Sequence, residues 1–210
     1  MTQKTIVLDF GGVLFDTSAN EFFSELFEQE GRSKEELEHF LANVFTKKDR
    51  SSSNDGDLRD MIEKKVQEHP EWEKEIRAFG TKEALIKTIR GIIPGMEVLL
   101  PEIKEAGYRI VGLTNWHGDT FDFLPEVFPC LLQHFNKIVV SGKVRLRKPD
   151  PEIFLRAQQE YGNPNPSDVF FFDDKPANIE SAKKAVGWNA FTFKSVETIR
   201  RVLALKPKPI

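Results

Sequence analysis

The chain of 210 residues lacks several features that define common protein classes. It has a single cysteine, Cys130, so an internal disulfide and a metal site built from several cysteines are both excluded. No apolar run approaches the ~18 residues of a membrane-spanning helix. No signal-peptide pattern precedes the first strand-like segment, and the formal net charge of -3 does not favour nucleic acid. We therefore expect a cytoplasmic protein that uses neither a membrane nor a nucleic acid as its partner.

The chain is rich in phenylalanine, with 18 residues, and hydrophobic residues make up 40% of it. This content is enough for a packed core and excludes a disordered chain. One concentrated basic stretch alternates Lys143, Arg145 and Arg147 with the apolar residues Val144 and Leu146. That alternation predicts one solvent-facing side of a strand or hairpin rather than a nucleic-acid surface.

Short segments that are apolar at almost every position indicate strands buried on both faces, as in a parallel sheet. The predicted strands are Thr5–Phe10, Tyr108–Asn115, Asn136–Ser141, Val169–Asp174 and Ala190–Phe193. The helical patterns between the later strands are Met96–Ala106, Pro151–Tyr161 and Ala177–Val186. Within the first of these, Pro101 is expected to kink or split the helix. This alternation of strands and helices predicts an α/β fold with a doubly wound parallel sheet.

The stretch from Asp16 to Arg90 has helical patterns and no convincing strand. Ser33 and Glu36 have the spacing of a capping box, which marks the start of one of these helices. The polar residues 51–56 predict a loop. We therefore expect a core domain made of residues 1–15 and 91–210, interrupted by a helical domain of residues 16–90. Nothing in the sequence calls for more than a monomer.

Charged and polar side chains follow the predicted strands. Asp9, Thr114, Lys148 and the pair Asp173-Asp174 each come at or after the end of a different strand. In an open parallel sheet the carboxyl ends meet at one edge, where ligands bind. Three carboxylates there repel one another unless a hard cation such as Mg²⁺ relieves the repulsion while it binds a substrate phosphate. Lys148 and Thr114 can supply the positive charge and the hydrogen bond that a phosphoryl group needs.

Four motifs resemble those of the haloacid dehalogenase-like hydrolase superfamily. They are LDFGGVLFD (8–16), LTNW (113–116), RKPDPEIF (147–154) and FFFDDKPANIESAKKAVG (170–187). The motifs occur in the order of the family, each with a predicted strand, and the resemblance covers essentially the whole chain. It implies a Rossmann-like core with a mobile helical cap of the C1 type, which corresponds to residues 16–90.

The resemblance also implies roles for the residues at the strand ends. Asp9 is the expected nucleophile, which forms an aspartyl-phosphate intermediate. It is expected to bind Mg²⁺ together with the backbone carbonyl of Gly11 and with Asp174. Asp173 is expected to bind the ion directly or through water.

Further residues are expected to contact the substrate, a small phosphorylated metabolite. Thr114 and Asn115 hold the phosphoryl oxygens, and Lys148 neutralises both the nucleophile and the transferred group. Trp116 is a candidate for packing on a sugar or on the cap.

Gly11 departs from the family pattern, because most phosphatases of this family have a second aspartate there that acts as general acid and base. Such a group contributes roughly 10²–10⁴-fold to the rate. One explanation is a substrate with a good leaving group, as in the family's bacterial sugar-1-phosphate phosphatases, which are similar at this position. A dehalogenase or a non-catalytic phosphate-binding protein would also lack the aspartate, and His117 is a candidate substitute. Family dehalogenases have Ser and Asn in place of Asp173 and Asp174, so the sequence favours a phosphatase.

Overall fold

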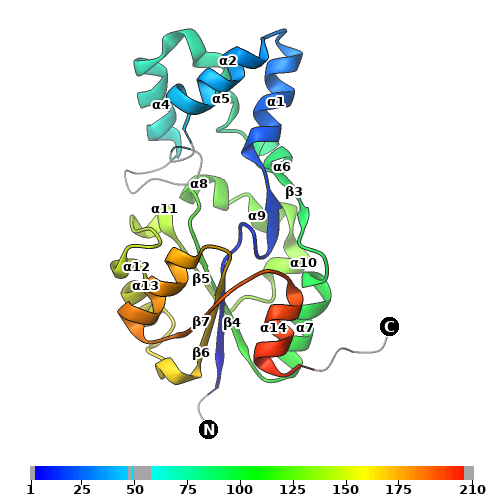
Figure 1. Cartoon of the computed structure of the whole chain (residues 1–210), viewed down its shortest axis with the longest axis vertical. Coiled ribbons are helices and arrows are strands. Elements are labelled where there is room, and N and C mark those ends of the chain that lie inside the picture. Colours follow the sequence, from blue (N-terminus) through cyan, green and yellow to red (C-terminus); the bar gives the residue numbers. More distant parts are fainter. Residues whose placement is uncertain (1–2, 47–48, 50–57, 206–210) are drawn as a thin grey trace.

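The structure is a computed structural model that describes residues 3–46, 49 and 58–205 (Figure 1). At its centre lies a five-stranded sheet in which every neighbouring pair of strands is parallel. The strands, in spatial order, are β5 (Lys137–Val140), β4 (Arg109–Thr114), β1 (Thr5–Leu8), β6 (Val169–Asp173) and β7 (Asn189–Thr192). The five predicted strands and the doubly wound α/β fold class are confirmed.

Strand β1 occupies the middle of the sheet. Leu8 pairs with Gly112 of β4 on one side and with Phe172 of β6 on the other. The chain builds β4 and β5 on one side of β1 and then crosses to the other side for β6 and β7. The carboxyl end of β1 is therefore the point where open α/β sheets bind ligands. Asp9 is the residue that follows it.

Helices cover both faces of the sheet. Successive residues of a strand point to opposite faces, so the apolar strands present apolar side chains on both faces. The four covering helices are α7 (Met96–Glu105), α14 (Val196–Leu203), α12 (Pro151–Glu160) and α13 (Pro176–Val186). Leu8 packs in the cluster with α7 and α14, whereas Val7 packs in the cluster with α12 and α13. Figure 1 shows the two pairs of helices on opposite sides of the sheet. Burial on both faces explains why the strands are apolar throughout.

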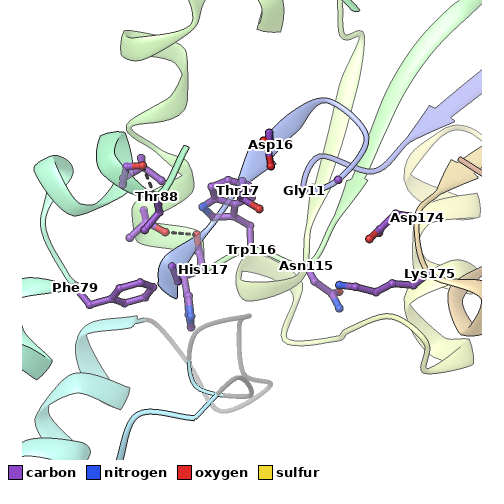
Figure 2. A pocket seen from close by; sticks show the side chains of 14 residues that line it. Gly11, Asp16, Thr17, Phe79, Thr88, Asn115, Trp116, His117, Asp174 and Lys175 are labelled. Carbon is purple, nitrogen blue, oxygen red and sulfur yellow. Dashed lines mark hydrogen bonds between the residues drawn. The ribbon is translucent and has the colours of Figure 1, made fainter. Parts of the chain in front are cut away.

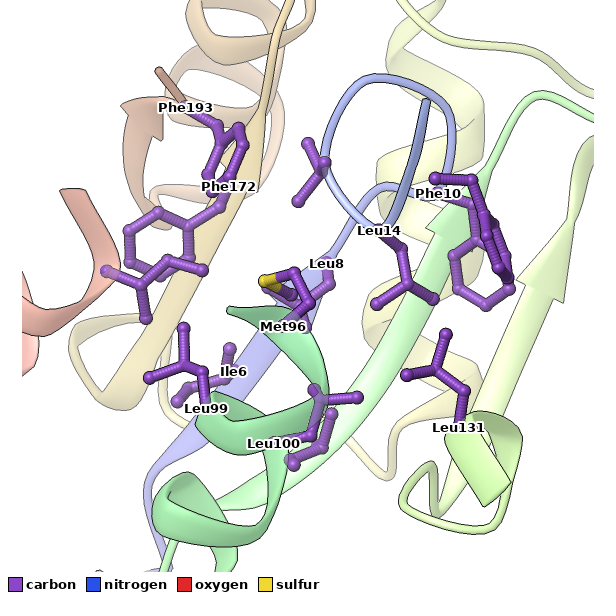
Figure 3. Close-up of a cluster of buried hydrophobic side chains, with 14 of the residues drawn as sticks. Ile6, Leu8, Phe10, Leu14, Met96, Leu99, Leu100, Leu131, Phe172 and Phe193 are labelled. Atoms are coloured by element: carbon purple, nitrogen blue, oxygen red, sulfur yellow. The ribbon is translucent and has the colours of Figure 1, made fainter. Parts of the chain in front are cut away.

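The cluster on the α7 side also anchors the loop that follows β1 (Figure 3). Phe10 and Leu14 of this loop are fully buried and flank the two glycines at positions 11 and 12. Asp9 is thereby held between a buried strand and a buried loop residue.

Of the kink or split expected at Pro101, the split does not occur, because α7 runs unbroken from Met96 to Glu105. Met96, Leu99, Leu100 and Ile103 are all fully buried. Burial of each such side chain contributes about 1.5–3 kcal/mol, which together outweighs the ~3 kcal/mol that a proline costs inside a helix.

The described part of residues 19–88 forms a separate layer of helices at one end of the sheet (Figure 1). Its elements are α1 (Ala19–Gln29), α2 (Lys34–His39), the π-helical turn η1 (Phe40–Val44), α4 (Leu58–Glu68), the 3-10 turn η2 (Pro70–Trp72), α5 (Glu73–Ala78) and α6 (Lys82–Thr88). The capping box of Ser33 and Glu36 is confirmed. A core of its own, rich in aromatic rings, includes Phe23, Phe40 and Trp72. The predicted loop at residues 51–56 lies outside the described residues.

The prediction that the stretch from Asp16 to Arg90 contains no strand is wrong at both of its ends. β2 (Phe15–Thr17) pairs antiparallel with β3 (Ile89–Ile92), so the chain enters and leaves the helical layer through one short ribbon. Each strand is three or four residues long, too short for a periodic pattern to be recognised.

Short helical turns connect the remaining strands. They are α8 (Gly118–Phe121), α9 (Leu124–Val127), α10 (Pro129–Leu132), α11 (Ser141–Val144) and η3 (Pro166–Asp168). The basic stretch after β5 is one of these turns and not a strand or hairpin, because Arg145 adopts a left-handed conformation that ends α11. Among the described helices, none has the length and apolar content that crossing a membrane requires.

Candidate active site

Two strand ends and one loop bring charged side chains together at the carboxyl edge of the sheet. Asp9 follows β1, and its backbone N–H donates to the carbonyl of Phe172 in β6 at 3.0 Å. Asp173 is the last residue of β6. Lys148 arrives from the loop between α11 and α12, where it precedes a cis peptide bond to Pro149. These residues were predicted to meet, and they do.

Lys148 is the central residue of this group. Its ammonium donates to Asp173 Oδ2 at 2.7 Å and to the carbonyl of Leu113 at 2.7 Å, and it lies 2.8 Å from Asp9 Oδ1. The side chain is only 1% exposed. Since an ammonium has three donors, this buried cation is fully occupied. By bridging the two carboxylates, the Lys148 ammonium holds Asp9 and Asp173 close together.

Burial and charge set the protonation of these groups. Burial, partly offset by Lys148, raises the pKa of Asp9 to about 7. Burial alone would lower the pKa of Lys148, but Asp9 and Asp173 overcome this effect and raise it. The pKa of Asp173 is lowered, because Lys148 and several hydrogen bonds outweigh its burial. One buried ammonium is thus shared between two carboxylates, and Asp9 lacks enough positive charge to stay ionised easily.

Both oxygens of Asp173 accept hydrogen bonds from the protein. Its Oδ1 accepts from the backbone of Lys175 at 2.8 Å, and Asn178 Nδ2 lies 2.8 and 2.9 Å from the two oxygens. Together with Lys148, these donors give both oxygens of the carboxylate a partner in the protein. Sequence reasoning assigned no role to Asn178. Asn178 lies within the fourth motif, as the third residue of α13.

Asp174 is in the opposite situation. Its Oδ1 is buried and has no hydrogen-bond partner within the described part of the chain. Burial raises the pKa of this carboxyl, and the neighbouring Asp173 adds to the effect. A Cβ atom at Gly12 would lie 2.9 Å from Asp174 Cγ, so only glycine permits this approach.

These carboxylates fit a divalent cation. One oxygen each of Asp9, Asp173 and Asp174 lie within 4.8 Å of one another. An unpartnered, buried carboxylate oxygen is costly unless a cation or a donor occupies the space beside it. A hard cation with oxygen ligands satisfies Asp174 and supplies the positive charge that Asp9 lacks.

Thr114 and Asn115 lie at the end of β4, beside β1. The Thr114 hydroxyl is buried and has no hydrogen-bond partner among the described residues, so it is available as a donor to a bound anion. The Asn115 side chain is engaged instead, because its amide donates to the Lys148 carbonyl and accepts from the Lys148 N–H, both at 2.9 Å. Asn115 thus positions Lys148, and its contact with phosphate stays a prediction.

A cavity of about 310 Å³, lined in part by Asp174, lies between the sheet and the helical layer (Figure 2). Gly11, Gly12 and Asp174 line it on the sheet side, and Phe79 and Leu85 line it on the helical side. This volume is at the lower end of the range for small-molecule sites. The cavity is therefore suited to a compact substrate.

Trp116 and His117 also line this cavity. The Trp116 ring lies edge-on to Phe15 and Phe121, which fixes it in the wall. His117 is 4% exposed, and its Nε2 lies 3.1 Å from the backbone carbonyl of Asp49. That contact ties His117 to the helical layer.

Gly11 has room for a side chain. A Cβ atom there would lie 3.5 Å from Thr17 Oγ1, an ordinary contact distance. The Cβ atom of the aspartate that most family phosphatases have at this position therefore meets no steric clash in this chain.

Comparison with known proteins agrees with this geometry. A protein-family model described as haloacid dehalogenase-like hydrolase matches residues 3–185. Protein CbbY of Rhodobacter capsulatus is 26% identical over 201 residues, which cover 88% of this chain and 83% of that protein.

Solved structures show the same fold. A predicted HAD-like hydrolase of Porphyromonas gingivalis superposes with a TM-score of 0.72 at 20% identity, over 98% of this chain and all of that one. A HAD family enzyme of Bacteroides thetaiotaomicron, in complex with magnesium and inorganic phosphate, superposes with a TM-score of 0.66 at 22% identity, over 92% of this chain and 95% of that one. A dehalogenase is also among the similar structures. At these identities the similarity shows the fold alone.

Proposed function

Since the chain belongs to the haloacid dehalogenase-like hydrolase family, we propose that it is a Mg²⁺-dependent phosphatase acting on a small phosphorylated metabolite. The main support is the charge balance at the sheet edge. Three carboxylates lie together with one buried ammonium, and an oxygen of Asp174 has no partner among the described residues. This arrangement suits a divalent cation and a phosphoryl group.

In the proposed reaction, an oxygen of Asp9 attacks the phosphorus atom, and the bond from phosphorus to the leaving oxygen breaks. The leaving group takes a proton from water. A second water then attacks the phosphorus of the aspartyl-phosphate, which releases inorganic phosphate and regenerates Asp9. Lys148 keeps Asp9 oriented and balances its charge, and the Thr114 hydroxyl donates to a phosphoryl oxygen.

The cation would be held by Asp9, by Asp174 and by the backbone carbonyl of Gly11. Asp173, whose oxygens are occupied by Lys148, Lys175 and Asn178, would contact it through water. When bound, Mg²⁺ supplies positive charge that offsets the charge of the phosphate.

Gly11 limits the range of possible substrates. The chain has no carboxylic acid at the position from which family phosphatases protonate the leaving group. His117 does not replace it readily, since its Nε2 contacts Asp49. We infer that the substrate has a leaving group that departs with little protonation, as an anomeric sugar 1-phosphate does.

A dehalogenase is the second candidate, because halide also leaves without a proton and dehalogenases share this fold. The Asp173-Asp174 pair argues against dehalogenase activity. A second carboxylate with an unsatisfied oxygen has no use in a site without a cation.

The clusters of buried residues support a division into two domains. Residues 1–15 and 91–210 form the proposed core domain and residues 16–90 the proposed cap, because the aromatic cluster of the helical layer is separate from the clusters of the sheet. The β2–β3 ribbon is the proposed hinge. We further propose that the protein works as a cytoplasmic monomer.

Phosphate release from a panel of phosphate esters, with and without Mg²⁺, tests the proposed function. Sugar 1-phosphates are compared with sugar 6-phosphates, and Asp9→Asn is the control. We expect Mg²⁺-dependent release that favours 1-phosphates and is absent in the variant. No release by a folded protein would reject the proposal, and a halide-release assay would then test the second candidate.

A further inference from the structure

The turn that follows Thr114, Asn115 and Trp116 contacts the helical layer directly. Asp119, in α8, points its carboxylate at the start of α4. The backbone N–H of Leu58 donates to Asp119 Oδ1 at 3.4 Å, and that of Arg59 donates to Oδ2 at 3.2 Å. The first amides of a helix have no partner inside the helix. Asp119 therefore caps α4 from a residue about sixty positions away in the sequence.

The position of Asp119 is well defined. Its Oδ1 also accepts from the backbone N–H of Thr120 at 2.9 Å. The first residue of α4, Leu58, is fully buried in the core of the helical layer. A negative charge at a helix N-terminus is also favoured by the helix dipole. The contact thus joins the held carboxylate of Asp119 to the anchored first turn of α4.

A second contact from the same turn reaches the same helix. His117 Nε2 lies 3.1 Å from the Asp49 carbonyl. The Asp49 carboxylate accepts from the N–H and hydroxyl of Thr46 at 2.8 and 2.7 Å, and it pairs with Lys65 of α4 at 3.5 Å. His117 and Asp119 therefore both connect the turn to α4.

This turn belongs to the wall of the active-site cavity, which includes Trp116, His117 and Thr120. It directly continues the segment that begins with Thr114. A shift of α4 relative to the sheet would therefore displace this part of the cavity wall. An ion pair that joins the helical layer to the sheet domain, Lys82 with Glu126, is exposed and expected to contribute little.

We propose that Asp119 is a positioning residue that docks the helical layer over the active site by capping α4. The proposal rests on the proposed phosphatase function for its effect on turnover, whereas the capping contact itself does not depend on that function. A substrate that binds between the two layers binds more tightly when the helical layer is docked on the sheet domain. Loss of the contact therefore weakens substrate binding and leaves the chemistry at Asp9 intact.

Three variants test this proposal with p-nitrophenyl phosphate and Mg²⁺ as the assay. Asp119→Ala removes the cap, whereas Asp119→Asn keeps a good capping side chain without the charge. Asp122→Ala is the matched control, because Asp122 follows the same short helix but forms an exposed ion pair with Lys143 of the sheet domain. We expect Asp119→Ala to raise KM about fivefold with kcat within twofold, as the loss of a helix cap would. Asp119→Asn and Asp122→Ala should keep the wild-type KM.

Amide hydrogen exchange of the first turn of α4 provides a readout that needs no activity. Exchange at Leu58–Ile62 should become faster in Asp119→Ala alone. Equal exchange and equal KM in Asp119→Ala and the wild type would overturn the proposal, as would an Asp119→Asn variant as impaired as Asp119→Ala. If the wild type hydrolyses no ester but the exchange result holds, the phosphatase function fails while the docking contact stands.

Discussion

The cavity lies between two regions that are stabilised differently: the carboxyl edge of the sheet, here called the floor, and the helical layer of residues 19–88, here called the roof. In the floor, Lys148, Asp173 and Asn178 are buried and satisfy one another through short hydrogen bonds. The roof is an aromatic cluster surrounded by ion pairs on exposed side chains, such as Arg77 with Glu63 and Lys87 with Glu25. Buried polar networks tolerate little change, whereas exposed pairs stabilise little. The reaction is therefore fixed by the floor, and the roof can vary to suit the substrate.

The largest effect is expected from the floor. Lys148→Met leaves two buried carboxylates, Asp9 and Asp173, without their ammonium. We expect the free energy of unfolding to fall by ~3–5 kcal/mol, as when one partner of a buried ion pair is removed. Phosphate release should be lost as well. Urea unfolding and a phosphate assay measure the two effects.

Lys143→Met is the control for this experiment, since Lys143 pairs with Asp122 on exposed side chains. It should change stability by little. If Lys148→Met were as stable and as active as the control, the floor would not be the rigid part of the site.

In the roof, Phe40→Ala removes a fully buried ring that contacts Phe23, Phe27 and Trp72. Loss of a buried phenylalanine costs ~3–5 kcal/mol, here confined to the cap. We expect a separate, earlier thermal transition for the cap in calorimetry, with the sheet domain melting as in the wild type. A single shifted transition would show that floor and roof unfold as one unit.

Gly11→Asp changes the chemistry without disturbing either region, because a Cβ there makes only an ordinary contact with Thr17. A positioned acid contributes roughly 10²–10⁴-fold, most for leaving groups that need a proton. We expect the variant to hydrolyse alkyl phosphates such as sugar 6-phosphates up to ~10²-fold faster. Its rate with sugar 1-phosphates should change far less. Equal gains on both classes would contradict the leaving-group argument.

The smallest effect concerns pH. The pKa of Asp9 is raised to about 7 by burial, so Asp9 takes up a proton as the pH falls through neutrality. A protonated carboxyl binds Mg²⁺ poorly, and metal binding must then release that proton. The Mg²⁺ concentration for half-maximal rate should rise as the pH falls from 8 to 6, by up to about tenfold per pH unit below the pKa. A requirement for Mg²⁺ that does not vary with pH would contradict this view of Asp9.

Most of the floor could be predicted from the sequence, because the motifs are local and strand ends of a parallel sheet converge. Asp9, Lys148, Asp173 and Asp174 meet as expected. No role could be assigned to Asn178, since its contact with Asp173 depends on how α13 packs against the end of β6.

The link between floor and roof could not be predicted either. Asp119 and Leu58 are far apart in sequence, and no pattern connects them. The β2–β3 ribbon is too short to give a periodic signal. Pro101 does not split α7, because burial of a whole helix face outweighs a local preference.

The central claim is that Asp9 attacks phosphorus in a Mg²⁺-dependent reaction. It is tested most directly by quenching the enzyme with acid during turnover of a sugar 1-phosphate and locating covalent phosphate by mass spectrometry. We predict a phosphate adduct on Asp9 that forms only with Mg²⁺ present and that is absent in Asp9→Asn. Turnover with covalent phosphate on another residue, or phosphate release that persists in Asp9→Asn, would contradict the account.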